Sequence, residues 1–230
     1  MARQFAALGY DLALCARRTD RLETLAEEIR ARTGRRVETD ALDVTDADAV
    51  PAVFHRFADM FGGIDRVVVN AGLGKGAPLG TGRPDANRAT AMTNFVGALA
   101  QMEAALEIFR RQGRGHLVLI SSMTALRGMR KSMTTYAATK AGLAALAEGV
   151  RSENIPGLDV SVIYPGYIRS EMNQHVQQKT RFMVDTETGV RSMVEAIEKR
   201  RTKAYVPAWP WVPIGAAMRV LPLSVVRRLT

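Results

Sequence analysis

Short apolar runs alternate along this chain with longer segments in which apolar residues recur every three or four positions. The short runs predict buried β-strands, and the longer segments predict amphipathic α-helices. The expected strands cover residues 10–16, 36–43, 64–70, 115–121, 159–164 and 203–206. The expected helices cover residues 2–8, 19–33, 45–61, 85–111, 132–154 and 186–201. Because strands and helices alternate throughout, we expect an α/β fold with a doubly wound parallel sheet between helical layers.

Cap and turn residues set the expected limits of several helices. Thr19 is predicted to cap the second helix, and Thr45 with Asp48 resembles a capping box at the start of the third. Glycines at positions 9, 34 and 62 follow the ends of the first three helices, where a left-handed residue is favoured. We therefore expect one continuous domain over residues 1–206.

The last part of the chain has a different composition. Residues 207–230 contain Trp209, Trp211 and four prolines, and residues 214–229 have the pattern of an amphipathic helix with apolar and basic faces. Three interpretations remain open for this tail. It could be a lid over an apolar substrate, a shallow membrane contact, or a segment that packs on the domain or at a dimer interface.

The composition narrows the class of protein. The chain is 47% hydrophobic and 24% charged, which is ordinary for a soluble globular protein. Its single cysteine, Cys15, lies in an apolar run and is predicted to be a core residue, and its three histidines lack metal-ligand spacing. No signal peptide or membrane-spanning segment is predicted. A cytoplasmic location is expected, with membrane association through the tail as an open alternative.

The net charge of +9 is concentrated near the C-terminus. Residues 191–230 carry eight lysines and arginines against two glutamates. Such an excess favours an anionic partner, for example a nucleotide or a membrane surface. The basic residues are not interleaved with aromatic ones, as they are in proteins that bind single-stranded nucleic acid, so a nucleic-acid partner is not predicted.

Candidate chemistry gathers where the predicted strands end, which is where ligands bind in doubly wound sheets. The segments that follow the strands are Arg17-Arg18, Asp43-Val44, Asn70-Ala71-Gly72, Ser121-Ser122 and Pro165-Gly166-Tyr167-Ile168. The helix after the fourth of these strands carries Tyr136 and Lys140, one turn apart on one face. A nearby ammonium would lower the pKa of the phenol, as proton exchange in carbonyl–alcohol interconversion requires.

From residue 2 to about residue 206, the order and spacing of these motifs resemble the short-chain dehydrogenase/reductase family, in its classical subgroup. Asn70-Ala71-Gly72 resembles the family's Asn-Asn-Ala-Gly element, although Val69 stands in place of its first asparagine. Residues 165–170 resemble its Pro-Gly-x-Ile-x-Thr segment, with Ser170 in place of threonine. The resemblance implies a Rossmann-like three-layer fold, a homo-oligomer, and an oxidoreductase that moves a hydride between NADP(H) and a carbonyl or secondary alcohol.

The resemblance also implies a catalytic set, which consists of Asn94, Ser122, Tyr136 and Lys140. Tyr136 would donate a proton to the carbonyl oxygen, Ser122 would hold that oxygen, and Lys140 would lower the pKa of Tyr136 and bind the nicotinamide ribose. Asn94 would position a water molecule that relays protons to Lys140. Ser122 precedes Tyr136 by fourteen residues, where thirteen is commoner, so Ser121 remains the alternative serine.

The implied cofactor-binding residues come from four strand ends and from the helix that carries Tyr136 and Lys140. They are Arg17, Arg18, Asp43, Val44, Asn70, Ala71, Gly72, Tyr136, Lys140, Pro165, Gly166, Ile168 and Ser170. No acidic residue lies at positions 16–18, where NAD-selective members hold the ribose hydroxyls. Because guanidinium groups suit a 2′-phosphate, we expect NADP(H) as the cofactor.

One element of the family pattern has no counterpart in the sequence. The family begins with a strand and a Thr-Gly-x-x-x-Gly-x-Gly turn that holds the pyrophosphate, whereas residues 2–8 resemble the later half of the following helix. Without that first strand, the strands at 10–16 and 64–70 lose their shared partner, and Leu12, Leu14, Val67 and Val68 should be incompletely buried. The alternative to an active enzyme is a catalytically silent fragment or binding protein.

Overall fold

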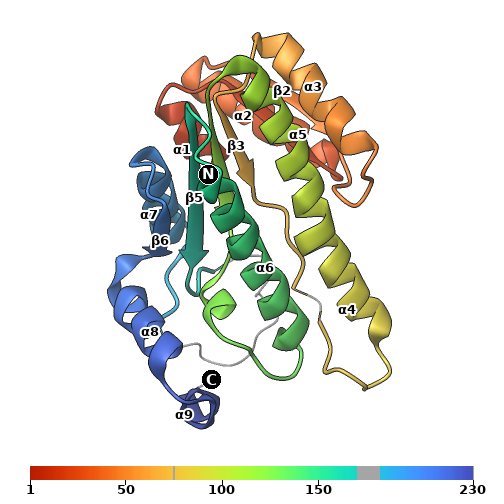
Figure 1. The fold of residues 1–230 in the computed structure, drawn as a ribbon. Coiled ribbons are helices and arrows are strands. Elements are labelled where there is room, and N and C mark those ends of the chain that lie inside the picture. The colour runs from red at the N-terminus through yellow and green to blue at the C-terminus, as the bar shows by residue number, and fades with distance from the viewer. Residues whose placement is uncertain (75, 170–181, 230) are drawn as a thin grey trace.

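The computed structural model describes residues 1–74, 76–169 and 182–229 (Figure 1). The strands are β1 Leu12–Ala16, β2 Val37–Ala41, β3 Arg66–Val69, β4 Gly115–Ile120, β5 Leu158–Pro165 and β6 Lys203–Val206. The helices are α1 Ala2–Ala7, α2 Thr19–Thr33, α3 Ala49–Phe61, α4 Pro84–Ala91, α5 Gly97–Gln112, α6 Met133–Ser152, α7 Thr186–Glu198, α8 Ala208–Val220 and α9 Leu223–Leu229. The predicted alternation of strands and helices is confirmed.

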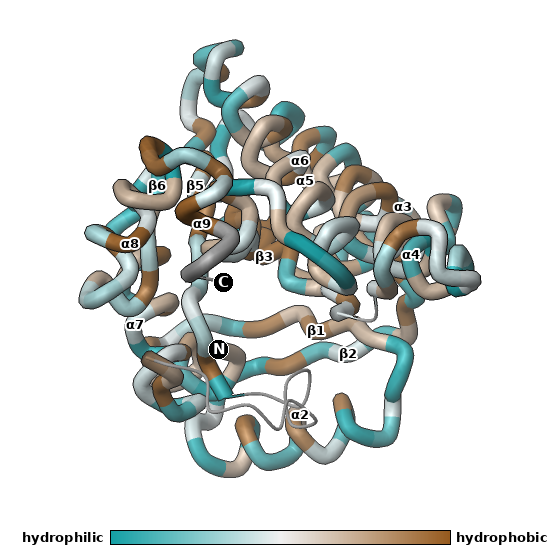
Figure 2. Tube along the Cα trace, turned by 90° about the horizontal axis from the view of Figure 1, so that it is seen from below, coloured by the Kyte–Doolittle hydropathy of each residue, from teal (hydrophilic) through white to brown (hydrophobic). Residues whose placement is uncertain are grey.

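All the strand pairs among the described residues are parallel, and they form two sheets. β3, β4, β5 and β6 pair in that order. β1 pairs with β2, and these two strands run side by side in Figure 2. No ladder joins β1 to β3 in the described part of the chain, as expected for two strands that lack a shared partner. Leu12, Leu14 and Val68 are half-buried, as predicted.

Val67 is the exception, because it is only 8% exposed. Its side chain points away from the apolar cluster that contains Val68 and instead joins the core beneath α3 and α5. The prediction of incomplete burial is therefore wrong for this residue, since helices on one face cover it whether or not a strand lies beside β3.

Helices cover both faces of the larger sheet. One core lies between β3, β4, β5 and the helices α3, α5 and α6, and a second joins β4, β5 and β6 to α1 and α7. Successive residues of β4 point into different cores, with Leu117 and Leu119 in the first and Val118 and Ile120 in the second. This alternation requires apolar residues at every inner position, as expected for a parallel strand between two helical layers.

The single long helix predicted over residues 85–111 is interrupted. A π-helical turn, Met92–Val96, separates α4 from α5 and carries the fully buried Asn94. Gly97 follows this turn and lies against the chain after β2, where an added Cβ would approach the Val44 carbonyl oxygen to 2.6 Å. Such π turns are frequent at functional sites because they re-aim one side chain within a helix.

The two predicted threonine caps are wrong. Thr19 is the first residue of α2, and Arg18 occupies the cap position without a side-chain cap hydrogen bond. At α3, the Asp46 carboxylate accepts hydrogen bonds from the backbone N–H groups of Asp48 and Ala49, at 3.2 and 3.1 Å. Thr45 instead donates its hydroxyl to Asp43. Asp46 therefore organises the start of α3, because its short carboxylate reaches these N–H groups.

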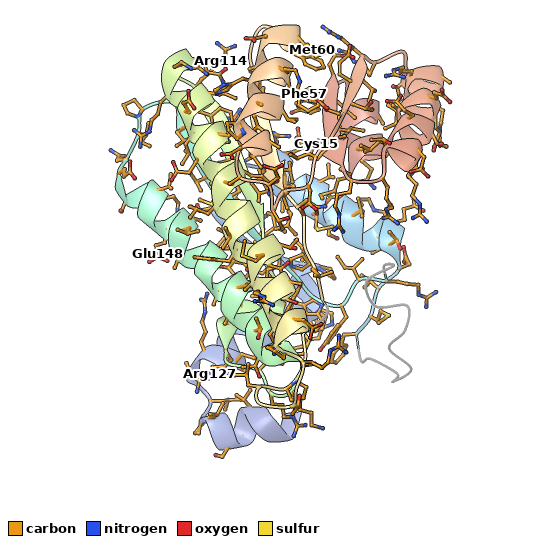
Figure 3. The ribbon with its side chains drawn as sticks, turned by 90° about the vertical axis from the view of Figure 1, so that its right-hand side faces the viewer. Cys15, Phe57, Met60, Arg114, Arg127 and Glu148 are labelled. Carbon is orange, nitrogen blue, oxygen red and sulfur yellow. The ribbon has the colours of Figure 1, made fainter. Side chains whose placement is uncertain are left out.

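The tail forms two helices in place of the single predicted helix at 214–229. α8 begins at Ala208 and ends before Leu221, whose extended backbone leads into Pro222 and α9. Trp211 is buried and belongs to the core that lies between the larger sheet and the helices α3, α5 and α6. The Arg127 guanidinium donates to the Leu221 carbonyl oxygen at 3.0 Å, and Arg127 lies beside the C-terminal helices in Figure 3. The tail thus packs on the preceding domain.

Candidate active site

A cavity of about 2200 Å³ opens at the C-terminal ends of the strands and extends along β1. Its lining includes all but one of the described residues that the sequence analysis assigned to catalysis or cofactor binding. Those residues are Arg17, Arg18, Asp43, Val44, Asn70, Ala71, Gly72, Ser122, Tyr136, Lys140, Pro165, Gly166 and Ile168. Asn94 is buried behind Gly72, and Ser170 lies outside the described residues.

The two candidate serines have different surroundings. Ser121 is buried, and its hydroxyl donates to the Lys140 carbonyl oxygen at 2.8 Å, so it braces α6 against β4. Ser122 lines the cavity and accepts hydrogen bonds from the Thr124 backbone N–H and hydroxyl, at 3.2 and 3.0 Å. Both serines line the cavity, but Ser122 is the one close enough to Tyr136 to oppose the rise in the pKa of that phenol, so the geometry favours Ser122 over Ser121 as the serine of the site.

Burial, rather than the neighbouring lysine, dominates the acid–base properties of Tyr136. Partial burial raises the pKa of the phenol, and the nearby Ser122 hydroxyl opposes this only in part. The Lys140 ammonium lies 5.9 Å from the Tyr136 ring centre and donates to the Ile120 carbonyl oxygen at 2.8 Å. The expected lowering of the tyrosine pKa by Lys140 is therefore not seen. Tyr136 is protonated at neutral pH and is available as a proton donor.

Lys140 is almost fully buried, and desolvation lowers the pKa of its ammonium to about 8. No carboxylate among the described residues contributes to this shift. An added Cβ on Gly72 would lie 3.5 Å from the Lys140 nitrogen and 3.6 Å from the Asn94 side-chain oxygen. The chain after β3 therefore runs within van der Waals contact of both polar groups at Gly72.

Asn94 holds the turn that follows β3. Its side-chain oxygen accepts from the Leu73 backbone N–H at 2.6 Å, and its side-chain nitrogen donates to the Leu73 carbonyl oxygen at 2.9 Å. A longer contact of 3.4 Å joins the same nitrogen to Thr139 on α6. These contacts fix the turn beside Lys140, while the water-relay role of Asn94 stays a prediction.

The opposite end of the cavity carries the residues predicted to hold the adenosine part of a dinucleotide. The Thr45 backbone N–H and hydroxyl bind the Asp43 carboxylate and lower its pKa, and Arg17 adds a weaker attraction from 3.7 Å. Arg17 is largely exposed at the cavity edge. The polar groups at this end and those near Tyr136 are compatible with the two riboses of a nicotinamide dinucleotide.

Between these two ends, the described residues supply few hydrogen-bond donors that could bind a pyrophosphate. The cavity there is lined by apolar residues of β1, including Leu12, Leu14 and Ala16. No glycine-rich turn follows β1 in the described part of the chain. The protein therefore fits a dinucleotide at its two ends, while the backbone amides that commonly hold the phosphates are not supplied there.

Several residues of the site were not predicted from the sequence. Thr124 orients Ser122, and Met123, Met133 and Trp211 line the cavity close to it. The spacing of Ser122 and Thr124 is a weak signal for a local hydrogen bond of this kind. The methionines carry no sequence signal, because apolar residues at helical spacing are equally typical of a core.

Residues 1–181 match the model of the short chain dehydrogenase family, and the chain belongs to this family. An uncharacterized oxidoreductase from Mycobacterium tuberculosis is 50% identical over 230 residues, which cover 99% of this chain and 90% of that protein. An uncharacterized oxidoreductase from Myxococcus xanthus is 33% identical, covering 96% of this chain and 87% of the relative. The protein is therefore an oxidoreductase of the short-chain dehydrogenase family.

A solved structure supports the same fold. A short-chain dehydrogenase from Sphingobium yanoikuyae in complex with NADPH superposes with a TM-score of 0.82 at 24% identity, over 99% of this chain and 87% of that one. The Rossmann-like α/β fold with parallel strands is thereby confirmed. Among the similar structures are complexes with NADP-type cofactors and with NAD, so a nicotinamide cofactor is typical of these neighbours.

Proposed function

We propose that this oxidoreductase interconverts a carbonyl compound and a secondary alcohol with NADP(H) as the cofactor. The observation that carries the proposal is the placement of Ser122 and Tyr136 at the wall of one cavity, with the buried Lys140 one turn further along α6. NADPH, when bound, supplies the hydride. In the direction of reduction, side chains of the protein bind the carbonyl oxygen and donate a proton to it.

Tyr136 is the proposed proton donor in the direction of reduction. Its pKa is raised by burial, so the phenol keeps its proton at neutral pH and can deliver it as negative charge develops on the carbonyl oxygen. Ser122 would bind the same oxygen, and Thr124 keeps its hydroxyl in place. Lys140 would hydrogen-bond the nicotinamide ribose, and Asn94 would keep the turn at residues 72–73 beside it.

NADP(H) is proposed rather than NAD(H) because of the charges at the end of β1. Arg17 and Arg18 line the cavity where it passes this strand, and the sequence Ala16-Arg17-Arg18 holds no acid to bind a ribose diol. A guanidinium group binds a phosphate through charge-assisted hydrogen bonds, and an unphosphorylated ribose offers no such partner.

Replacing both Arg17 and Arg18 with alanine is expected to weaken NADPH binding by about 1–3 kcal/mol, the scale of hydrogen bonds between charged groups. NADH binding should change little, because NADH has no 2′-phosphate. Titration calorimetry with both cofactors measures the difference, in a chain that binds NADPH. Arg32→Ala is the matched control, since Arg32 lies on α2 and pairs with Glu28 at the surface. Equal losses for the two cofactors would refute the role of the arginines.

We also propose that the outer surface of the two C-terminal helices, α8 and α9, contacts an anionic membrane surface. Trp209, Val220 and Leu223 are 78%, 81% and 61% exposed. Arg219 is exposed among them, and no acidic residue occurs after Glu198. Exposed apolar side chains together with an excess of cations are complementary to the interface of an anionic bilayer. None of the described helices has the length and apolar character needed to cross a membrane.

The full chain is expected to sediment with vesicles that contain phosphatidylserine and to bind more weakly to vesicles of phosphatidylcholine alone. Replacing Trp209 and Leu223 with serine should reduce this binding several-fold, because both exposed apolar contacts are lost. Met60→Ser is the control, since Met60 is an exposed apolar residue at the opposite end of the molecule (Figure 3). Absence of binding by the full chain would contradict the proposal, and a dimer dissolved by the same substitutions would assign this face to a second copy.

A further inference from the structure

Among the described residues, the wall of the cavity beside Ser122 and Tyr136 combines a large apolar part with a few polar residues, among them Thr124 and Ser132. The apolar part is formed by Met123 after β4, by Met129 and Met133 around the start of α6, and by the inner face of the two C-terminal helices. The residues contributed by those helices are Trp211, Ile214, Ala217, Met218, Leu221 and Val226. The segments 121–147 and 207–230 contain no acidic residue. The charged residues that these segments contribute to the lining are Arg130, Lys131 and Lys140.

Close contacts hold the C-terminal helices against the catalytic segments. Trp211 is 5% exposed, and its indole lies so close to Gly166 that an added Cβ would meet it at 2.0 Å. Tyr167 packs edge-on against the same indole, with ring centres 5.6 Å apart. Further along α8, a Cβ on Gly215 would lie 3.2 Å from the Met123 methyl group. Glycine at positions 166 and 215 therefore lets α8 approach the site as a fixed wall.

The two faces of α8 are used differently. Trp211, Ile214 and Met218 recur at three- and four-residue intervals and line the cavity, whereas Val212 is exposed and does not line it. This spacing places the lining residues on one side of the helix. The inner face of α8 consequently belongs to the site, and it is the part of the tail that can select a substrate.

We infer that the substrate is a bulky apolar ketone or the corresponding secondary alcohol, an inference that rests on the proposed function of the same site. Its oxygen lies at Ser122 and Tyr136, and its hydrocarbon body lies against Met123, Met218 and Leu221. A polyhydroxylated substrate would leave its hydroxyl groups without partners against these three side chains, at a cost in binding. Methionine side chains are flexible and polarizable, so the wall accommodates apolar bodies of different shape.

The test compares methyl ketones of increasing chain length, from acetone to undecanone, with dihydroxyacetone. Binding to the full chain is measured by saturation-transfer NMR without cofactor, and kcat/KM is measured with NADPH in a chain that binds this cofactor. Each added methylene that becomes buried is expected to improve binding and kcat/KM by about fourfold. Dihydroxyacetone should bind no better than acetone.

A matched pair of substitutions on α8 tests the wall itself. Met218→Lys is expected to weaken undecanone binding by about tenfold or more and to leave acetone nearly unchanged, because only the longer ketone reaches α8. Val212→Lys adds the same charge to the exposed face of the same helix and should change neither. If circular dichroism shows that Met218→Lys fails to fold, Met129→Gln serves the same purpose from the opposite wall.

The results distinguish the substrate class from the reaction. Undecanone binding no tighter than that of acetone, or equal losses in Met218→Lys and Val212→Lys, would overturn the inferred substrate class even if ketones are reduced. Selective undecanone binding that Met218→Lys abolishes supports the apolar site. If that selective binding occurs without turnover of any ketone, the proposed reaction fails and the apolar ligand class stands.

Discussion

Tyr136→Phe is expected to lower NADPH-dependent carbonyl reduction by about 10²-fold or more while NADPH still binds. The substitution removes the phenol proton that the site supplies to the carbonyl oxygen and leaves the ring, which lies 5.9 Å from the Lys140 ammonium, in place. Steady-state rates and NADPH titration are measured in a chain extended at its N-terminus so that it binds the cofactor.

The control for this substitution is Tyr10→Phe. Tyr10 lines the cavity just before β1, and its hydroxyl donates to the Glu198 carboxylate at 3.0 Å. Its loss therefore removes a phenol of the same cavity that has no proposed part in the reaction. Rates within a factor of a few of the parent for Tyr136→Phe would refute the assignment of the proton donor. A similar fall for Tyr10→Phe would show that the loss reflects the fold rather than the chemistry.

Adding a strand and a Gly-rich turn before Met1 is expected to have a large effect on NADPH binding and on aggregation. Residues 1–230 alone are expected to bind NADPH weakly and to aggregate, and the extended chain to bind it about 10²-fold more tightly or better. The reason is that backbone N–H groups at a helix N-terminus would then face the pyrophosphate, and each hydrogen bond to a charged group contributes about 1.5–3 kcal/mol.

The same addition should improve folding. β1 and β3 have no ladder between them in the described structure, and Leu12, Leu14 and Val68 are only half-buried. A strand placed there would pair their open edges and cover these side chains, which reduces edge-to-edge association. Titration calorimetry measures the affinity for NADPH, size-exclusion chromatography measures aggregation, and thermal unfolding measures the stability of the fold.

The control is an extended chain in which valines replace the glycines of the turn. It should gain solubility from the added strand without the gain in NADPH affinity, because side chains would keep the backbone away from the phosphates. Tight NADPH binding and cooperative unfolding by residues 1–230 alone would show that the described chain already completes the cofactor site in another way.

Much of the fold follows from short-range patterns in the sequence. β6 has the limits that the sequence predicted, and β4 and β5 differ from their predictions by one or two residues, because continuous apolar runs define strands that are buried on both faces. The helix starts were less predictable. The cap expected at Thr19 is wrong because α2 begins one residue earlier than a threonine cap would require, with Arg18 at the cap position. The cap expected at Thr45 is wrong because the neighbouring Asp46 carboxylate binds the N–H groups at the start of α3.

The residues of the candidate site were also largely predicted from the sequence, although one local feature of the structure was not. Residues at the ends of parallel strands must meet at one edge of the sheet, so the sequence alone brought Ser122, Asn70 and Gly166 together with the Tyr136 helix. It did not predict the π-helical turn around Asn94, whose side chain hydrogen-bonds Leu73 from a distant part of the sequence.

The sequence by itself determined the order of strands and helices, the family, and the polar residues that line the cavity, because these depend on local periodicity and on motif spacing. Only the tertiary structure decided which serine faces Tyr136, in which direction the pKa of that tyrosine moves, and which face of α8 lines the cavity. Each of these depends on burial and on contacts between segments distant in sequence. Trp211 shows the difference most clearly, since only the folded chain places its indole against Gly166 and makes the tail part of the site.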